Sequence, residues 1–325
     1  MKVALTGATG FVGSWLAEEL VQDGHEVTCL VRRTSNLRWI QHLPLHIIVG
    51  DATQRETLLP FVEDQDIILH LAGLTKARTD EEYWRANAES TRHLLEAILE
   101  AQQKLVRFVL ISSQAAAGPS LQNRPRREQD SPQPLTAYGR SKLEAERIAL
   151  EYRADFPITI IRPPAVYGPR DRDILTYFRL ANRRLVPVLG QDGRISVVFV
   201  RNLTYGIRLA MTHPRAENEI YFLADEGVYS WRELGTMIAS AIGKRPLVVR
   251  VPMRFIRFAA IISQTYSKLL GRAVLLNREK LLEIRQPYWT LSIEKAKTDL
   301  GYSPPYTTTE AIRLTADWYR EQGWL

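Results

Sequence analysis

Residues 1–14 read MKVALTGATGFVGS, and this stretch decides the fold. The short apolar run VAL predicts a buried strand, and Gly7, Gly10 and Gly13 follow it at spacings of three. An amphipathic run that begins at Phe11 predicts a helix. Glycines let the backbone turn tightly and approach a ligand, and a helix start offers free N–H groups to a pyrophosphate. The pattern therefore predicts a dinucleotide-binding turn, with an ordinary strand–helix turn as the alternative.

Composition excludes several classes of protein. The net charge of +7 is mild and accompanies no nucleic-acid motif, so we expect no nucleic-acid partner. Cys29 is the only cysteine, which rules out an internal disulfide and fits a reducing compartment. No apolar run reaches the ~20 residues of a membrane span, and the first apolar run is too short for a signal peptide. We therefore expect no integral membrane segment and a cytoplasmic location.

Strands and helices are predicted to alternate through the first half of the chain. This alternation predicts an α/β fold, a Rossmann-type doubly wound parallel sheet. The predicted strands after the first cover 26–31, 45–49, 66–71, 108–112 and 158–161, and the predicted helices include 80–103 and 138–152.

The pattern becomes irregular after Gly168. A strand over 195–200 and a helix over 203–211 are predicted, and short elements with several prolines follow. We expect a smaller C-terminal substrate domain that is interleaved with the first. The predicted division assigns 1–168 and about 195–216 to the cofactor-binding domain, and about 169–194 and 217–325 to the substrate-binding region.

The end of the second strand indicates which cofactor is used. Enzymes that select NAD usually place an acid there to hold the ribose hydroxyls. Here Val31 occupies that position, and Arg32 and Arg33 follow it. Guanidinium groups pair with a 2′-phosphate, so we expect NADP(H) to be preferred, with NAD(H) possible. The alternative is a solvated basic loop.

Other candidate cofactor contacts follow the third and fourth strands. Asp51, next to Ala52, could reach an adenine edge or could cap the following helix. The small residues after His70 would let a cofactor lie against the backbone. His70 itself reads as a packed strand residue, and we expect no metal site.

Three residues carry the expected chemistry. Tyr138 and Lys142 are four apart on a predicted helix and share a face. A nearby ammonium favours phenolate, so we expect Lys142 to lower the pKa of Tyr138 and also to bind cofactor ribose. Ser113 follows a central strand and could hold the same substrate oxygen. Tyr138 would then exchange a proton with a carbinol or carbonyl, while the cofactor carries hydride.

The chain resembles the extended short-chain dehydrogenases/reductases of the NAD-dependent epimerase/dehydratase superfamily. The resemblance rests on TGATGFVGS, on HLAG from His70, on ISS ending at Ser113, on YGRSK from Tyr138 and on RPPAVYGP from Arg162. It implies catalytic roles for Ser113, Tyr138 and Lys142 and a small-molecule substrate. It also implies a homodimer. The expected cofactor-binding residues are Gly7, Thr9, Gly10, Phe11, Val12, Gly13, Arg32, Arg33, Asp51, Ala52, Leu71, Ala72, Gly73, Asn87, Tyr138, Lys142 and Pro163.

Departures from the family's patterns indicate which subgroup of the family the chain resembles. Gln114 and Ala115 stand where 4,6-dehydratases have an Asp-Glu pair, and Ala165 stands where nucleotide-sugar epimerases have an asparagine. The remaining resemblance is to 3β-hydroxysteroid dehydrogenases and dihydroflavonol 4-reductases. We therefore expect an oxidoreductase that interconverts a secondary alcohol and a ketone on a small, fairly apolar molecule. A nucleotide-sugar epimerase and a non-catalytic cofactor-binding protein remain alternatives.

An apolar stripe at helical spacing lies within residues 253–270. Its members are Phe255, Phe258, Ile262, Tyr266 and Leu269. The stripe could form a lid over an apolar substrate, contact a membrane surface, or pack on the protein's own core.

Overall fold

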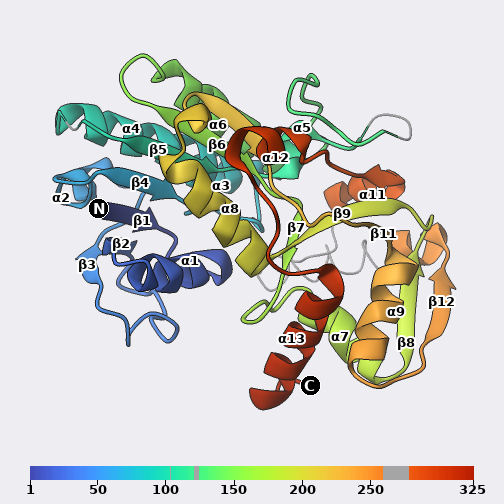
Figure 1. Cartoon of the computed structure of the whole chain (residues 1–325). Coiled ribbons are helices and arrows are strands. Elements are labelled where there is room, and N and C mark those ends of the chain that lie inside the picture. Colours follow the sequence, from blue (N-terminus) through green and yellow to red (C-terminus); the bar gives the residue numbers. More distant parts are fainter. Residues whose placement is uncertain (103, 121–123, 259–277) are drawn as a thin grey trace.

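The computed structural model describes residues 1–102, 104–120, 124–258 and 278–325, and its main feature is a sheet of seven strands (Figure 1). The strand order is β10-β6-β5-β4-β1-β2-β3, and every neighbouring pair is parallel. The expected α/β doubly wound fold is therefore confirmed. The strands are β1 Lys2–Thr6, β2 Glu26–Val31, β3 His46–Val49, β4 Ile67–His70, β5 Arg107–Ile111, β6 Ile158–Arg162 and β10 Glu219–Phe222.

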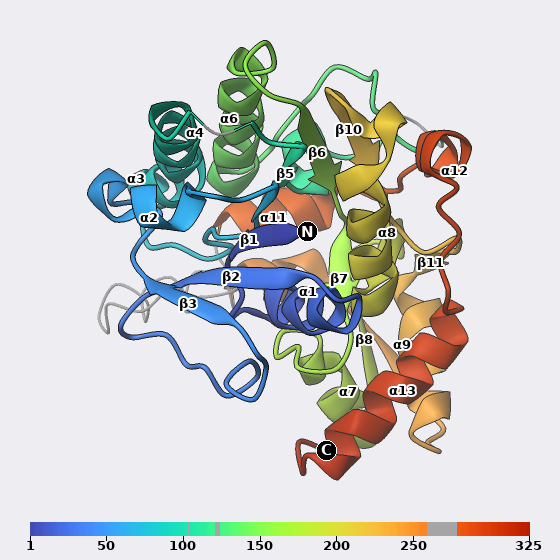
Figure 2. The ribbon, with the colours of Figure 1, turned by 60° about the vertical axis from the view of Figure 1, so that its left-hand side comes forward.

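Apolar side chains on both faces of these strands explain why the sheet is buried between two helical layers. In β1, Val3 and Leu5 join one core cluster, and Ala4 between them joins the other. The first cluster includes side chains of α1 (Phe11–Gln22) and α8 (Val200–Thr212), and the second includes those of α4 (Ser90–Glu100) and α6 (Ala137–Glu151). Figure 2 shows α4 and α6 on one side of the sheet and α1 on the other. Continuous apolar strands of this kind are typical of parallel sheets.

The remaining helices are short or belong to the C-terminal half. They are α2 Leu59–Val62, α3 Asp80–Tyr83, α5 Gln114–Ala117, α7 Leu175–Asn182, α9 Trp231–Ala241, α11 Arg278–Arg285, α12 Glu294–Leu300 and α13 Thr308–Glu321, with 3-10 turns η1 Arg55–Thr57 and η3 Pro214–Ala216. The helix expected over 80–103 is divided, because a π-helical turn, η2 (Trp84–Glu89), separates α3 from α4. Such turns are rare and often occur at functional sites.

A smaller sheet lies beside α7, α9 and α13 (Figure 1). It joins β9 (Arg194–Phe199) to β7 (Ala165–Tyr167), β11 (Val228–Ser230) and β13 (Tyr288–Trp289). A separate pair consists of β8 (Leu185–Leu189) and β12 (Leu247–Val251). The strand expected over 195–200 is β9 and lies in the smaller sheet, whereas β10 extends the large sheet. We propose that the two domains divide along these sheets.

Part of the apolar stripe expected over 253–270 can be placed. Residues 253–258 are helical, and the side chains of Phe255 and Phe258 are 56% and 65% exposed. Ile262, Tyr266 and Leu269 lie outside the described residues. Among the helices that are described, we find none with the length and apolar character that crossing a membrane requires.

The first turn gives a test of backbone packing. A Cβ on Gly13 would lie 2.1 Å from the Gly7 carbonyl oxygen, which cannot move without opening the turn. We expect Gly13→Ala to lower the free energy of unfolding by about 3 kcal/mol. Gly24→Ala is the control, because Gly24 has φ +80° and no heavy atom within 4 Å, so only backbone strain of about 1 kcal/mol is expected. Urea unfolding measures both, and equal losses would contradict the packing argument.

Candidate active site

The glycine turn forms a backbone cradle at the carboxyl end of β1. Gly7 has φ +74°, and a Cβ there would lie 2.9 Å from the backbone N of Ala72. Gly10 caps α1 without any side-chain hydrogen bond, and no acid lies in the first helical turn. Because no side chain fills this cradle or caps the backbone N–H groups at the start of α1, the turn fits the pyrophosphate of a dinucleotide.

A threonine holds the neighbouring loop against this turn. The Thr6 hydroxyl oxygen accepts hydrogen bonds from the backbone N–H groups of Leu71 (3.1 Å) and Ala72 (3.0 Å). It also lies 2.8 Å from Nδ1 of His70. Burial, with a smaller contribution from Lys142, lowers the pKa of His70 to about 3, so this imidazole is neutral. Within the described part of the chain, no cluster of metal-ligating side chains surrounds it.

Ser113 and Tyr138 are brought together by close packing of α5 on α6. Ser113 caps α5, and its hydroxyl oxygen accepts a hydrogen bond from the backbone N of Ala115 at 3.1 Å. Thr136 caps α6 through Gly139 N at 3.1 Å. A Cβ on Gly139 would lie 2.4 Å from the Ala115 carbonyl oxygen, so glycine allows the two helix starts to meet. The Ser113 hydroxyl thereby comes close enough to the Tyr138 phenol to lower its pKa.

The expectation that the pKa of Tyr138 is lowered is wrong. Burial raises the pKa of Tyr138 to about 12, and Glu283 and Tyr83 raise it further. The nearby Ser113 hydroxyl opposes this shift without reversing it. Because the buried hydroxyl loses hydration that would stabilise phenolate, Tyr138 is a neutral phenol at neutral pH.

Lys142 lies one turn after Tyr138 and is buried at 5% exposure. Burial lowers the pKa of its ammonium to about 8, although Glu146 opposes the shift. Its Nζ makes no hydrogen bond or ion pair with any residue that the structure describes. A Cβ on Gly73 would lie 3.8 Å from this nitrogen. The ammonium thus faces the backbone of the loop after β4, where three available donors fit ribose hydroxyls.

Asn87 fixes that loop from the π-helical turn. Its Oδ1 accepts a hydrogen bond from Leu74 N at 2.9 Å, and its Nδ2 donates to Leu74 O at 3.2 Å and to the Ser141 hydroxyl at 2.9 Å. Both ends of the amide are therefore engaged with protein. The predicted cofactor contact of Asn87 stays a prediction, and its visible role is to position Gly73 beside Lys142.

Sequence reasoning missed a buried ionic network behind these groups. Arg162 donates to Glu146 through Nε (2.9 Å) and a terminal nitrogen (2.5 Å), and both side chains are almost fully buried. The Ser112 hydroxyl also donates to Glu146. Glu146 lies four residues after Lys142 on one helix face, which is the only signal in the sequence. Pro163 follows Arg162, and its carbonyl accepts Gln114 N at 2.8 Å, which ties β6 to the Ser113 loop.

The other predicted cofactor residues lie around the same edge of the sheet. Arg32 and Arg33 are exposed after β2 and form no ion pair with described residues. Asp51 is engaged locally, because its Oδ1 accepts hydrogen bonds from the Thr53 N–H (2.9 Å) and hydroxyl (2.8 Å). The remaining predicted residues include partly buried Thr9, buried Ala52 in the second core cluster, and Phe11 and Val12, which pack on the core of the smaller sheet.

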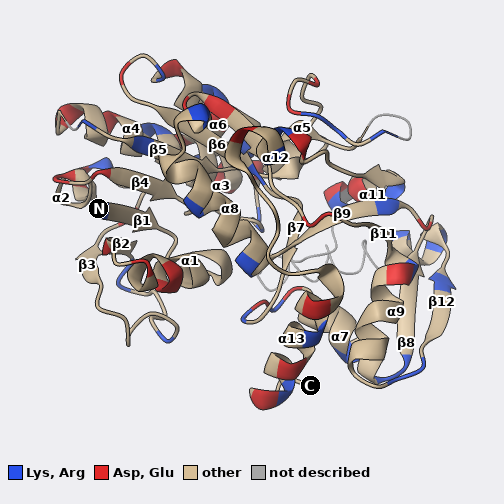
Figure 3. Ribbon diagram, in the orientation of Figure 1, with Lys and Arg blue, Asp and Glu red and all other residues tan. Residues whose placement is uncertain are grey.

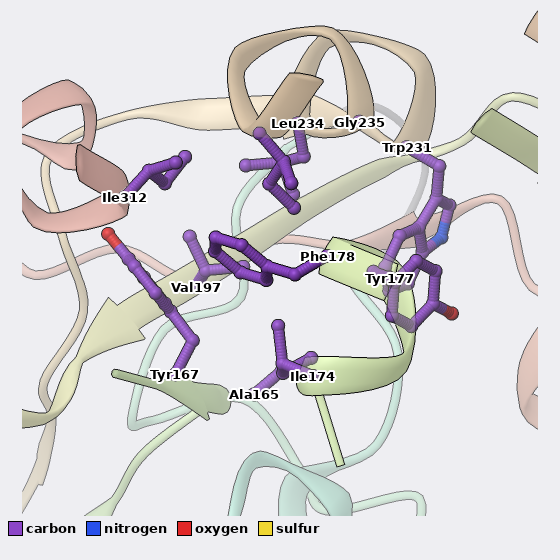
Figure 4. A pocket seen from close by; sticks show the side chains of 11 residues that line it. Ala165, Tyr167, Ile174, Tyr177, Phe178, Val197, Trp231, Leu234, Gly235 and Ile312 are labelled. Carbon is purple, nitrogen blue, oxygen red and sulfur yellow. The ribbon is translucent and has the colours of Figure 1, made fainter. Parts of the chain in front are cut away.

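An apolar cavity of about 40 Å³ opens at Ala165, two residues after Pro163. Figure 4 shows Tyr177 and Trp231 at one end and Tyr167 and Ile312 at the other. The rings of Tyr177 and Trp231 are stacked with centroids 5.3 Å apart. The position singled out in the sequence, Ala165, thus presents a methyl group to an apolar pocket.

Comparisons with known proteins agree with this geometry. Residues 3–224 match the model of the NAD dependent epimerase/dehydratase family. Ceramide reductase of Caulobacter vibrioides is 32% identical over 99% of this chain and 96% of its own length, and 3-beta-hydroxysteroid dehydrogenase of Mycolicibacterium neoaurum is 28% identical over 98% and 92%. The NAD complex of Thermus thermophilus UDP-glucose 4-epimerase is 22% identical over 98% of this chain and 99% of its own, with a TM-score of 0.79, which shows a shared fold.

The buried ionic network gives a test by a double-mutant cycle. We expect Arg162→Met to lower the free energy of unfolding by about 4 kcal/mol, because it leaves the Glu146 carboxylate buried without its cation. The double variant Glu146→Leu/Arg162→Met should recover most of this loss, since no unpaired charge remains. Denaturant unfolding measures the two single variants, Arg162→Met and Glu146→Leu, and the double variant. If the double variant is as unstable as the sum of the single ones, the pair is not coupled as the geometry indicates.

Proposed function

Because the chain belongs to the NAD-dependent epimerase/dehydratase family, we propose that it is an NAD(P)(H)-dependent oxidoreductase that interconverts a secondary alcohol and a ketone. The observation that carries the proposal is the close approach of the α5 and α6 starts, which places the hydroxyls of Ser113 and Tyr138 beside each other, with Lys142 one turn further along α6. These groups lie at the carboxyl ends of the parallel strands, where open α/β sheets bind ligands.

The neutral phenol of Tyr138 is the form that donates a proton during carbonyl reduction, and the same groups would serve the reverse oxidation, so they do not set the direction of the reaction. A bound nicotinamide cofactor would supply the hydride. Ser113 holds the carbonyl oxygen, and the neutral phenol of Tyr138 donates a proton to that oxygen as negative charge develops on it. A phenol with a pKa of about 12 stays protonated at neutral pH and is still more acidic than a developing alkoxide. Lys142 binds the cofactor ribose in this proposal.

NADP(H) is the proposed preferred cofactor. Arg32 and Arg33 follow β2 directly and leave their guanidinium groups exposed, without ion pairs to described residues. No acid at the end of β2 competes for the ribose hydroxyls. A 2′-phosphate would supply the missing counter-charge.

We propose a small, fairly apolar substrate, part of which would contact the apolar pocket lined by Ala165; at about 40 Å³ the pocket is too small for the whole molecule. Its lining is made almost wholly of aliphatic and aromatic side chains. The names of two relatives, ceramide reductase and 3-beta-hydroxysteroid dehydrogenase, also refer to apolar compounds. The alternative is a nucleotide-sugar epimerase, since the family's description includes epimerases. Ala165 favours the reductase, because its methyl group cannot hydrogen-bond a sugar.

Two further properties belong to this proposal. We propose a homodimer, on the family resemblance alone, and a cytoplasmic location. Cys29 is buried in β2, and burial raises the pKa of its thiol to about 12. Such a thiol is compatible with a reducing compartment.

Tyr138→Phe tests the catalytic role. The variant keeps the ring and removes only the hydroxyl, so we expect normal NADPH binding and a loss of turnover of about 1000-fold. Nicotinamide fluorescence measures binding, and ketone-dependent NADPH oxidation, screened over apolar ketones, measures turnover. Tyr152→Phe, at the far end of α6 and outside both the hydroxyl pair and the pocket, is the matched control. Undiminished turnover in Tyr138→Phe would contradict the catalytic role of Tyr138 and favour a different enzymatic activity or a non-catalytic function for the protein.

Arg32→Ala/Arg33→Ala tests the cofactor preference. We expect the wild type to bind NADPH more tightly than NADH, and the double variant to lose this preference by about tenfold or more. The exposed Arg153→Ala serves as control and should change neither affinity. Preference for NADH, or NAD that stays bound through purification, would move the epimerase to first place.

A further inference from the structure

The β8–β12 pair exposes an apolar face. The strands are parallel, with Leu247 opposite Leu185 and Val249 opposite Pro187, so these side chains share one face. On the opposite face Val186 and Val188 of β8 are buried, and a Cβ on Gly235 of α9 would meet Val186 at 2.3 Å, whereas Arg250 of β12 is exposed. On the outer face, Leu247 is 64% exposed, Val249 40% and Leu185 39%.

Cations flank this face at both ends. Parallel strands begin at one edge, so Arg183 and Arg184 before β8 lie near Lys244 and Arg245 before β12, and Leu247 N donates to Arg184 O at 2.7 Å. After β12, the helical residues 253–258 expose two arginines together with Phe255 and Phe258. The two arginines are Arg254, which lies over the Phe255 ring at 5.0 Å, and Arg257.

Acids are missing from the two sequence segments that form this face. The sequence has no Asp or Glu from Ile174 to Gln191 or from Leu234 to Phe258. None of the six cations forms an ion pair with a residue in the described ranges. Figure 3 shows cations on the loops at the starts of β8 and β12, with the acid of α9 at the far end of that helix. The one cation on β12 itself, Arg250, lies on the face opposite Leu247 and Val249. The face is therefore apolar, exposed and uniformly positive.

We propose that the surface formed by β8, β12 and residues 253–258 docks on an anionic lipid membrane. The cations complement anionic headgroups, and the exposed Leu247, Phe255 and Phe258 fit the boundary between headgroups and acyl chains. A soluble anion would use the arginines but not these apolar side chains. The chain would lie on the membrane and not span it. Vesicle binding is measured without turnover, so the proposal does not rest on the catalytic function.

Flotation of the full-length protein with vesicles tests the proposal. We expect binding to mixed phosphatidylglycerol–phosphatidylcholine vesicles and little binding to pure phosphatidylcholine. Arg183→Glu/Arg245→Glu should weaken binding by about tenfold or more. Arg153→Glu/Arg313→Glu makes the same charge change at exposed sites elsewhere and should bind like the wild type.

A second variant separates insertion from simple charge attraction. Leu247→Ser/Phe258→Ser changes only exposed side chains, keeps every cation, and should also weaken vesicle binding. Undiminished binding by this variant would overturn the proposal in favour of non-specific charge attraction, as would equal binding to neutral vesicles or none to either. Size-exclusion chromatography tests whether the face instead binds a second copy of the chain. If the wild type is an oligomer and Leu247→Ser/Phe258→Ser dissociates it, the face is a subunit interface and membrane docking is overturned.

Discussion

Close approach of backbone to backbone at the carboxyl edge of the large sheet is the constraint on which the site depends. A Cβ would lie 2.1 Å from a carbonyl oxygen at Gly13 and 2.4 Å from one at Gly139. The first contact holds the start of α1 over the turn after β1, and the second holds α6 against α5. Without these two approaches, neither the phosphate cradle nor the hydroxyl pair of Ser113 and Tyr138 would form.

Burial sets the charges of this edge as strongly as the neighbouring ions do. Lys142, Arg162 and Glu146 place two cations and one carboxylate in a nearly dry layer, and burial lowers the pKa of Lys142 to about 8. His70 lies in the same layer and stays neutral. Lys142, whose ammonium loses its proton more readily than usual, therefore lies near Tyr138, whose phenol stays protonated. This arrangement suits proton donation by Tyr138.

The fold and the central residues were predictable because they depend on local patterns. Short continuous apolar runs and the glycine spacing around Gly10 need no tertiary information, and Tyr138 with Lys142 is a helical i,i+4 pair. The predicted direction of the Tyr138 pKa shift was wrong because the shift depends on tertiary structure. Burial raises this pKa most, and Glu283, far away in the sequence, raises it further. The Glu146–Arg162 pair likewise joins a helix to a strand, and sequence reasoning had no means of pairing them. Which sheet β9 and β10 join is equally a matter of long-range packing.

The place of β10 determines when the large sheet can be completed during synthesis. β10 pairs with β6 only after α8 and the strands β7, β8 and β9 have been made, so residues up to Phe222 must leave the ribosome first. Until then β6 presents an unpaired edge of apolar residues, which is prone to pair with another chain. A nascent chain of this protein therefore passes through an interval in which chaperone binding would protect the β6 edge from aggregation.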